Sequence, residues 1–423
     1  MGQTNLKSPK LIICVIIINM ITSSEKRNEK KVQRRHQRVW SFLRIVAPPF
    51  LRMKFGYSCE LAPDISEPYL VLPNHNSDLD PAFVGFSFKK QMYFVASEHV
   101  YRRGFVSKLL FWAFEPIAKM KGASDTLTVM KAIRKLRTGQ NVCLFPEGNR
   151  SFNGKTGAIF EATGKLVKTS GAALVTYKIT GGYLSNPRWG FGIRKGKMHG
   201  SVVNVYSSSE LKLMTPEEIT NKIISDLDED AYKRQSFENI AYKGKNLAYG
   251  FETAYCLCPI CKNINVISSN KNSIYCSNCG KLTDILPTGF FSEGFQFKSA
   301  SEWDEWQESY FEMMINDKRD RLICLFSDSN MDVHIVKAEH QQEDLGIGSI
   351  SLFCDRIEIS VGENLISLPY DKISDMSIYG KNNLVFTDSE GCHYEIVPCE
   401  KKSLKNMRKY LSIWKIKRSE LTK

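Results

Sequence analysis

Four short apolar segments between residues 69 and 177 constrain the fold of this chain most strongly. They cover residues 69–72, 92–96, 141–145 and 172–177, and the first and third are each followed by a proline. Short apolar runs that stop at turn residues are typical of buried strands. Residues 124–138 carry apolar side chains at helical spacing, at Leu127, Met130, Ile133 and Leu136. Strands that alternate with helices predict an α/β fold, with a sheet flanked by helices.

The net charge of +13 is concentrated at the amino end of the chain. Residues 1–54 hold 12 Lys and Arg against 2 acidic residues, which makes a local charge of +10. Residues 11–21 are apolar except for Asn19. A membrane-spanning helix needs about 20 apolar residues, and no stretch of the chain reaches that length, so a polytopic membrane protein is excluded. Because no clear cleavage pattern follows, we expect residues 1–24 to be an apolar anchor or signal-like segment rather than a removed export signal.

Residues 25–55 join a run of charges to short apolar pieces around Trp40. Apolar side chains beside Trp, Arg and Lys are typical of a helix that lies in a membrane interface. The Pro48-Pro49 pair predicts a break between two such pieces. The alternative is a helix packed in the core with a solvated basic flank. The membrane interpretation is favoured, with an anionic lipid surface as the expected partner.

His75 and Asp80 are candidates for acid–base chemistry. On one continuous helix their side chains would point well apart, so they can meet only if a helix begins between or beside them. Pro81 is such a helix-start signal. A carboxylate bound to one imidazole nitrogen leaves the other nitrogen as a base. The alternative is a turn in which Asp80 only caps a helix.

A second candidate site is the segment Phe-Pro-Glu-Gly-Asn-Arg-Ser at residues 145–151, which directly follows an apolar strand. Ligands of α/β sheets collect at the carboxyl ends of strands. Gly148 allows a ligand to approach the backbone closely, and Arg150 offers a planar fork for phosphate. The alternative is a turn that ends a strand and carries a surface ion pair.

Together, the two motifs resemble the glycerolipid acyltransferase family, in particular bacterial 1-acylglycerol-3-phosphate acyltransferases. The first family block has the form N-H-x-S-x-x-D and is matched at Asn74, His75, Ser77 and Asp80. The third block has the form F-P-E-G-T-R-S and is matched at every position except Asn149. Residues 181–189 resemble a subgroup of these enzymes. The resemblance covers about residues 40–235.

The resemblance implies transfer of a fatty acyl group from acyl-CoA or acyl-carrier protein to a lysophospholipid. Lysophosphatidic acid is the expected acceptor, giving phosphatidic acid in phospholipid synthesis. His75 would be the general base on the acceptor hydroxyl and Asp80 would orient it, without an acyl-enzyme. Because acyl donors are cytosolic, the protein is expected on a membrane with its catalytic domain on the cytoplasmic side.

The resemblance also implies how the acceptor phosphate is held. Glu147, Gly148 and Arg150 would help to bind the glycerol phosphate. The second family block usually supplies an Arg, whereas this chain has Lys119 and Lys121 there. A lysine would act as a point charge without the bidentate fork, which makes acceptor identity a central question.

Four cysteines form two C-x2-C pairs with 14 residues between them, at Cys258, Cys261, Cys276 and Cys279. This spacing predicts a structural zinc ribbon over residues 250–290. The other eight cysteines are scattered, which is typical of a reducing compartment, although Cys256 could compete as a ligand. A redox pair is disfavoured because no thioredoxin-like context surrounds either motif. No organic prosthetic group is expected.

The remaining boundaries are an acyltransferase domain at 56–240, a helical linker at 291–320 and a β-rich domain at 321–423. The last domain ends in a helix and faintly resembles a pleckstrin-homology or GRAM-type module, as an analogy of fold only. A rival hypothesis is a catalytically weak protein that binds lipid or a partner. A nucleic-acid binder is disfavoured because the ribbon has few basic residues among its aromatics.

Overall fold

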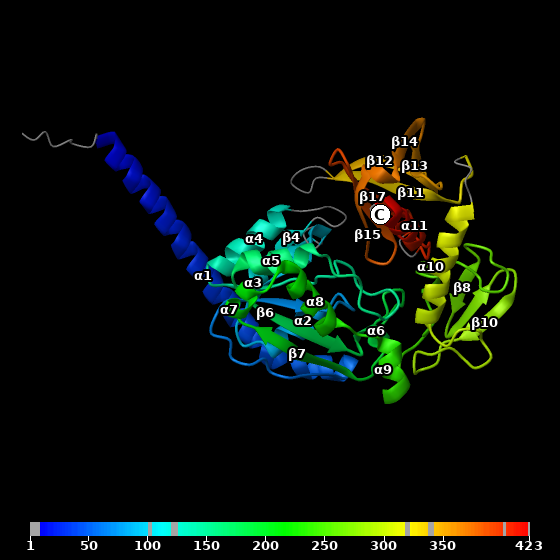
Figure 1. Cartoon of the computed structure of the whole chain (residues 1–423), viewed down its shortest axis with the longest axis horizontal. Coiled ribbons are helices and arrows are strands. Elements are labelled where there is room, and N and C mark those ends of the chain that lie inside the picture. The colour runs from blue at the N-terminus through cyan, green and yellow to red at the C-terminus, as the bar shows by residue number, and fades with distance from the viewer. Residues whose placement is uncertain are drawn as a thin grey trace, which may run out of the picture.

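The computed structural model describes residues 9–99, 104–119, 126–317, 322–336, 342–400 and 403–421. It divides into an α/β domain with a long amino-terminal helix, a small three-stranded sheet, and a second seven-stranded sheet (Figure 1). Helix α10 (Ala300–Asp317) lies between the small sheet and the carboxyl-terminal sheet. Along the chain, the α/β part is followed by the small sheet, α10 and the carboxyl-terminal sheet.

The first sheet has the strand order β1-β7-β6-β2-β5-β3-β4. Its neighbours run parallel except for the antiparallel pair β6 and β7. Its strands are β1 (Tyr57–Cys59), β2 (Tyr69–Pro73), β3 (Met92–Ser97), β4 (Ile117–Lys119), β5 (Asn141–Cys143), β6 (Ala173–Thr180) and β7 (Met198–Tyr206). The shorter helices are α2 (Asp80–Ser87), α3 (Phe105–Phe114), α4 (Thr126–Arg137), α5 (Ala162–Ser170), α6 (Gly182–Ser185), α7 (Ser208–Leu213), α8 (Pro216–Leu227) and α9 (Ala231–Glu238).

The central strand β2 is buried on both faces, as expected for a parallel strand between helical layers. Leu70 and Leu72 pack with Leu136 of α4 and Ile219 of α8. The alternate residue Val71 packs on the other face with side chains of α1 and α2. The two layers of helices therefore enclose the sheet and leave its strand ends open for a site.

Helix α1 (Pro9–Phe55) runs without interruption through Pro48 and Pro49. The predicted break at this pair is therefore wrong. Trp40 and Leu51, on either side of the prolines, are buried in the same core cluster. Their shared packing holds the helix together despite the backbone bonds that two prolines remove. None of the described helices is both long enough and apolar enough to cross a membrane.

The predicted helix at 124–138 is observed as α4, and only some of its regularly spaced apolar side chains face the core. Leu136 is buried, whereas Leu127 and Met130 are 67% and 60% exposed. The buried positions are instead Thr128 and Ala132, which share a face with Leu136. The apolar residues at threefold spacing therefore do not all face the core.

The carboxyl-terminal sheet is antiparallel, with the order β14-β13-β12-β11-β17-β16-β15. Its strands are β11 (Phe326–Val336), β12 (Gln342–Leu352), β13 (Arg356–Val361), β14 (Asn364–Pro369), β15 (Ile373–Tyr379), β16 (Asn383–Asp388) and β17 (His393–Pro398). Helix α11 (Arg408–Leu421) packs on this sheet through Tyr410 and Trp414. Strands followed by a helix were predicted, and the pleckstrin-homology resemblance stays a prediction.

Candidate active site

Two neighbouring parallel strands bring the two sequence motifs together. Strand β2 ends at Pro73 just before His75, and β5 ends at Cys143 just before Glu147. Val71 and Cys143 are paired in register, so both strands end at the same edge of the sheet. The N–H of Ser151 donates to the carbonyl of His75 over 2.9 Å, which joins the two loops directly.

His75 and Asp80 form a hydrogen-bonded pair. Helix α2 begins at Asp80 with Pro81 in its first turn, as the sequence predicted. The Nδ1 of His75 lies 2.9 Å from Oδ2 of Asp80. With an N–H at Nδ1, the Nε2 atom is unprotonated and can accept a proton from a substrate hydroxyl. The imidazole is 19% exposed, so a substrate can reach it from solvent.

The carboxylate of Asp80 is held by further hydrogen bonds and is fully buried. Its Oδ2 accepts from the N–H groups of Asn76 and Ser77 over 2.6 and 2.9 Å. Its Oδ1 accepts from the Ser77 hydroxyl over 2.6 Å. These donors stabilise the anion and fix its position. Asp80 therefore orients His75 from a rigid support, and the imidazole also packs on Phe145 with ring centroids 4.3 Å apart.

Glu147 binds the backbone of its own chain with both carboxylate oxygens. Oε1 accepts from the N–H of His75 and Oε2 from the N–H of Gly157, each over 2.6 Å. Burial raises the pKa of Glu147 to about 8, while these two backbone bonds act in the opposite direction. Glu147 therefore ties the His75 loop to the segment that follows the second motif.

Replacing Glu147 by glutamine is expected to destabilise the domain. Above pH 8, where Glu147 is ionised and both of its oxygens accept, a glutamine amide keeps one acceptor oxygen and turns its NH₂ toward the other backbone N–H, which leaves buried donors without an acceptor. Such a loss costs about 1–3 kcal/mol. Thermal unfolding above pH 8 should give a lower melting temperature for Glu147→Gln than for the wild type. Glu161→Gln, on the exposed start of α5, is the matched control. Equal midpoints for both variants would contradict this account of Glu147.

Gly148 and Arg150 form the rest of the second motif. Gly148 has a φ of 67°, the left-handed conformation in which glycine has no steric penalty. The side chain of Arg150 is 7% exposed, and its Nη1 lies 3.6 Å from Oδ2 of the exposed Asp78. A planar guanidinium at the strand ends, close to the His75 loop, can bind a phosphate group.

The two lysines of the second-block region are placed differently. Lys119 is the last residue of β4, and its charge acts on Asp375 of the carboxyl-terminal sheet. Burial raises the pKa of Asp375 on β15, and the charge of Lys119 counteracts that shift. Lys121 lies outside the described residues.

Two cations that were not assigned a role from the sequence accompany Arg150. Arg188 is buried, and its Nη1 donates to the carbonyl of Arg150 over 2.9 Å. Burial lowers the pKa of Lys381 to about 8, Arg150 and Arg188 act in the same direction, and Asp78 opposes them. Arg188 lies in the segment 181–189 that resembled a subgroup, whereas no local pattern marked Lys381. The site therefore gathers positive charge from three separate parts of the chain.

The four motif cysteines come together in the small sheet of β8 (Ile267–Asn270), β9 (Ser273–Cys276) and β10 (Gly280–Asp284). Their Sγ atoms lie within 4.8 Å of one another, with Cys258 to Cys279 at 3.9 Å and Cys261 to Cys276 at 3.7 Å. Tetrahedral Zn²⁺ with Zn–S bonds of about 2.3 Å places thiolates about 3.8 Å apart. The arrangement of the four cysteines therefore fits a zinc ion.

Cys256 lies outside this group. It is buried in the core of the carboxyl-terminal domain, and its N–H donates to Gln307 of α10 over 2.9 Å. Burial raises the pKa of its thiol to about 12, which disfavours the thiolate that a metal needs. Cys256 therefore packs as an apolar residue between the ribbon and the last domain.

Comparison with known proteins matches residues 52–180 to the Acyltransferase family model. A curated relative is the chloroplastic 1-acyl-sn-glycerol-3-phosphate acyltransferase LPAT1 of Arabidopsis thaliana, 25% identical over 149 residues. The match covers 34% of this chain and 40% of the relative, so the chain spans less than half the length of that protein.

Two solved structures also resemble parts of the chain. The 1-acyl-sn-glycerophosphate acyltransferase PlsC from Thermotoga maritima is 17% identical with a TM-score of 0.35, over 47% of this chain and 76% of that one. Inner Membrane Complex Sub-compartment Protein 3 from Toxoplasma gondii is 11% identical with a TM-score of 0.18, over 26% and 86%. The part of this chain that matches the acyltransferase family, residues 52–180, is therefore the part that holds His75, Asp80, Glu147 and Arg150.

Proposed function

We propose that this protein transfers a fatty acyl group from acyl-CoA or acyl-carrier protein to a lysophospholipid. Lysophosphatidic acid is the expected acceptor, and phosphatidic acid is the product. The observation that carries the proposal is the His75–Asp80 pair, which lies beside a buried Arg150 within the segment that matches the acyltransferase family.

The reaction needs one base and no covalent enzyme intermediate. Nε2 of His75 removes the proton of the acceptor hydroxyl as its oxygen attacks the thioester carbonyl. A C–O bond forms, the C–S bond breaks, and the thiolate takes up a proton that His75 can return to it. Asp80 keeps the imidazole in the tautomer that this step requires and stabilises the imidazolium that forms.

The positively charged side chains around Arg150 are the expected binding site of the acceptor phosphate. Burial lowers the pKa of Lys381 and of Arg188, the charge of Arg150 acts in the same direction on both, and Asp78 opposes it. A phosphate dianion brought near these cations relieves their repulsion and gains charge-assisted hydrogen bonds from Arg150. The charge therefore favours a phosphorylated acceptor over a neutral alcohol.

The test is acyl transfer by the purified full-length protein in mixed micelles. Labelled acyl-CoA and acyl-carrier protein are offered with lysophosphatidic acid, glycerol 3-phosphate, lysophosphatidylcholine or monoacylglycerol. We expect labelled phosphatidic acid as the main product. Transfer to lysophosphatidylcholine or monoacylglycerol at an equal rate would contradict the phosphate assignment. No transfer to any acceptor would favour a protein that only binds lipid.

We further propose that Cys258, Cys261, Cys276 and Cys279 hold a structural zinc ion. Four thiolates close the coordination sphere and leave no position for a substrate. The zinc would stabilise the ribbon and would take no part in acyl transfer.

A membrane surface is the expected location of the enzyme, and α1 supports it with two opposite apolar faces. One face packs in the core through Trp40, Leu51 and Phe55. The other exposes Phe42 and Ile45, which lie about 170° and about 110° around the helix from the centre of the buried face. Further exposed apolar side chains are Val46, Phe50 and Met53 on α1, Phe105, Leu109 and Trp112 on α3, and Leu127 and Met130 on α4.

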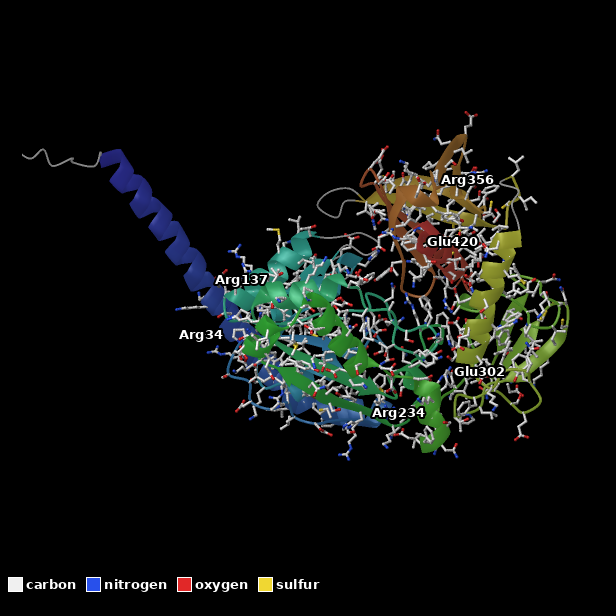
Figure 2. The ribbon with its side chains drawn as sticks, in the orientation of Figure 1. Arg34, Arg137, Arg234, Glu302, Arg356 and Glu420 are labelled. Atoms are coloured by element: carbon white, nitrogen blue, oxygen red, sulfur yellow. The ribbon has the colours of Figure 1, made fainter. Side chains whose placement is uncertain are left out.

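Basic residues accompany these apolar side chains, which favours an anionic bilayer as the occupant of the surface. Arg52 and Lys54 are exposed near the end of α1. Arg34 on α1 and Arg137 on α4 lie at the end of the domain from which α1 projects (Figure 2). Apolar residues with a basic rim are typical of helices that bind anionic lipid from one side.

Replacing both Phe42 and Ile45 by aspartate is expected to weaken vesicle binding at least about tenfold, because each buried apolar side chain contributes roughly 1.5–3 kcal/mol. Sedimentation with phosphatidylglycerol-rich vesicles measures the loss. Leu365→Asp is the control, since Leu365 is equally exposed on β14 but belongs to the last domain. Binding that survives in the double variant, or that is lost equally in the control, would contradict a membrane surface on α1.

A further inference from the structure

The carboxyl-terminal sheet contacts the second motif directly, through the residue at which this chain departs from the family pattern. Asn149 stands where the family block has threonine. Its Oδ1 accepts from the hydroxyl of Ser377 on β15 over 2.8 Å. Ser377 is 4% exposed, so this contact is enclosed between the domains.

Arg188 makes a second connection between the same two parts. One guanidinium nitrogen, Nη1, donates to the carbonyl of Arg150 over 2.9 Å and lies 3.5 Å from Oδ1 of Asn149. The other, Nη2, donates to the carbonyl of Ile378 on β15 over 2.7 Å. The planar fork of Arg188 therefore bridges the backbone of the second motif and the edge strand of the last sheet.

Lys381, in the turn after β15, holds Arg188 from the other side. Its Nζ donates to the carbonyl of Arg188 over 2.9 Å and to the carbonyl of Gly190. It also lies over the ring of Phe191, 4.5 Å from the centroid. The turn after β15 is thereby fixed to the segment that carries Arg188.

A separate contact keeps β15 and β17 against the α/β domain. The Nε2 of His99, just after β3, lies 2.5 Å from Oε1 of Glu395 on β17, and both side chains are buried. The His99 ring also stacks on Tyr379, with centroids 3.6 Å apart. The α/β domain and the carboxyl-terminal domain therefore meet at two places, around Arg188 and around His99.

We propose that the carboxyl-terminal domain is a positioning element of the acceptor site, and that Ser377 and Asn149 form the contact that sets the position of Arg150. Ser377 fixes the Asn149 side chain, while Arg188 fixes the adjacent carbonyl of Arg150. A phosphorylated acceptor therefore meets a preformed guanidinium instead of a mobile one. Ordering that group before binding removes a cost from acceptor binding. The assignment of a phosphorylated acceptor rests on the proposed function.

The test is a kinetic cycle of Ser377→Ala, Asn149→Ala and the double variant. Each single variant is expected to raise KM for the lysophospholipid about threefold to tenfold, the effect of one hydrogen bond, with KM for the acyl donor unchanged. KM for the lysophospholipid in the double variant should be no higher than in the single variant with the larger increase, because the two single variants remove the same contact. Ser360→Ala, on the exposed face of β13, is the matched control and should behave as wild type.

Amide hydrogen exchange supplies a readout that does not need catalysis. Exchange in residues 149–151 should become faster in Ser377→Ala and stay unchanged in Ser360→Ala. An unchanged acceptor KM, additive effects in the double variant, or an equal rise in donor KM would each overturn the proposal. If wild type transfers no acyl group, the proposed function fails, and exchange alone then decides whether Ser377 positions the motif.

Discussion

Replacing His75 by alanine is expected to lower kcat for acyl transfer by at least about a hundredfold, because a positioned general base contributes about 10²–10⁴ to the rate. The acceptor hydroxyl would still bind beside Arg150, but no group at Nε2 would take its proton. KM for the lysophospholipid should change little, since the phosphate is assigned to other residues. Initial rates at saturating donor and acceptor measure this effect.

The matched control is His199→Ala on β7, a histidine that bonds to Ser58 and Glu60 away from the two motifs. It should keep wild-type kcat. We expect the His75 variant to remain folded, because the backbone hydrogen bonds of Asp80 and Glu147 do not require the imidazole. Thermal unfolding of the variant checks this. A folded variant that keeps more than half of the wild-type rate would show that His75 is not the base.

Replacing Cys276 by serine is expected to remove the zinc ion that we propose for the four cysteines and to destabilise the ribbon by several kcal/mol. Four-cysteine and related zinc sites contribute about 10–16 kcal/mol to isolated small domains, so the loss of one ligand is a large part of the stability of such a fold. Metal analysis should fall from one zinc per chain to none, and the melting temperature should fall with it. Chelation of the wild-type protein should have the same effect.

The control for this prediction is Cys324→Ser, an exposed cysteine outside the group, which should leave metal content and melting temperature unchanged. Wild-type protein that contains no zinc, and whose stability does not respond to zinc or a chelator, would contradict the site. A variant that loses zinc without any change in stability would contradict its structural role.

The loss of zinc should also destabilise the carboxyl-terminal domain, because α10 packs against both the ribbon and that domain. Trp303 is buried in the core of the ribbon, and its indole N–H donates to the carbonyl of Leu257 over 3.2 Å. The next residue, Asp304, forms a buried bidentate ion pair with Arg408 of α11. The ribbon therefore supports the helix against which the carboxyl-terminal domain packs.

Local patterns in the sequence predicted the elements whose signals lie within a few residues. The apolar run at 69–72 lies in β2, and the run at 141–145 begins with the three residues of β5. Predictions that depended on the environment were less accurate. The break at Pro48 does not occur, because Trp40 and Leu51 pack in the same core cluster on either side of the prolines.

The site was predictable to the same extent. The helix start at Pro81 was a local signal that His75 and Asp80 can meet. In the structure, the pairing of β2 with β5 places the second motif beside them. Asn149 and Ser377 are 228 positions apart in the sequence, so no local spacing predicts their contact. In the sequence, Asn149 was only a mismatch to a family pattern, and its partner gives that mismatch a physical reason.

The most direct measurement of the central claim is the release of free thiol from acyl-CoA and acyl-carrier protein, followed together with consumption of lysophosphatidic acid. We expect thiol release to need the acceptor, to equal the phosphatidic acid formed, and to fall at least about a hundredfold in the His75 variant. No thiol release from either donor with any lysophospholipid, or equal release in the His75 variant, would contradict it.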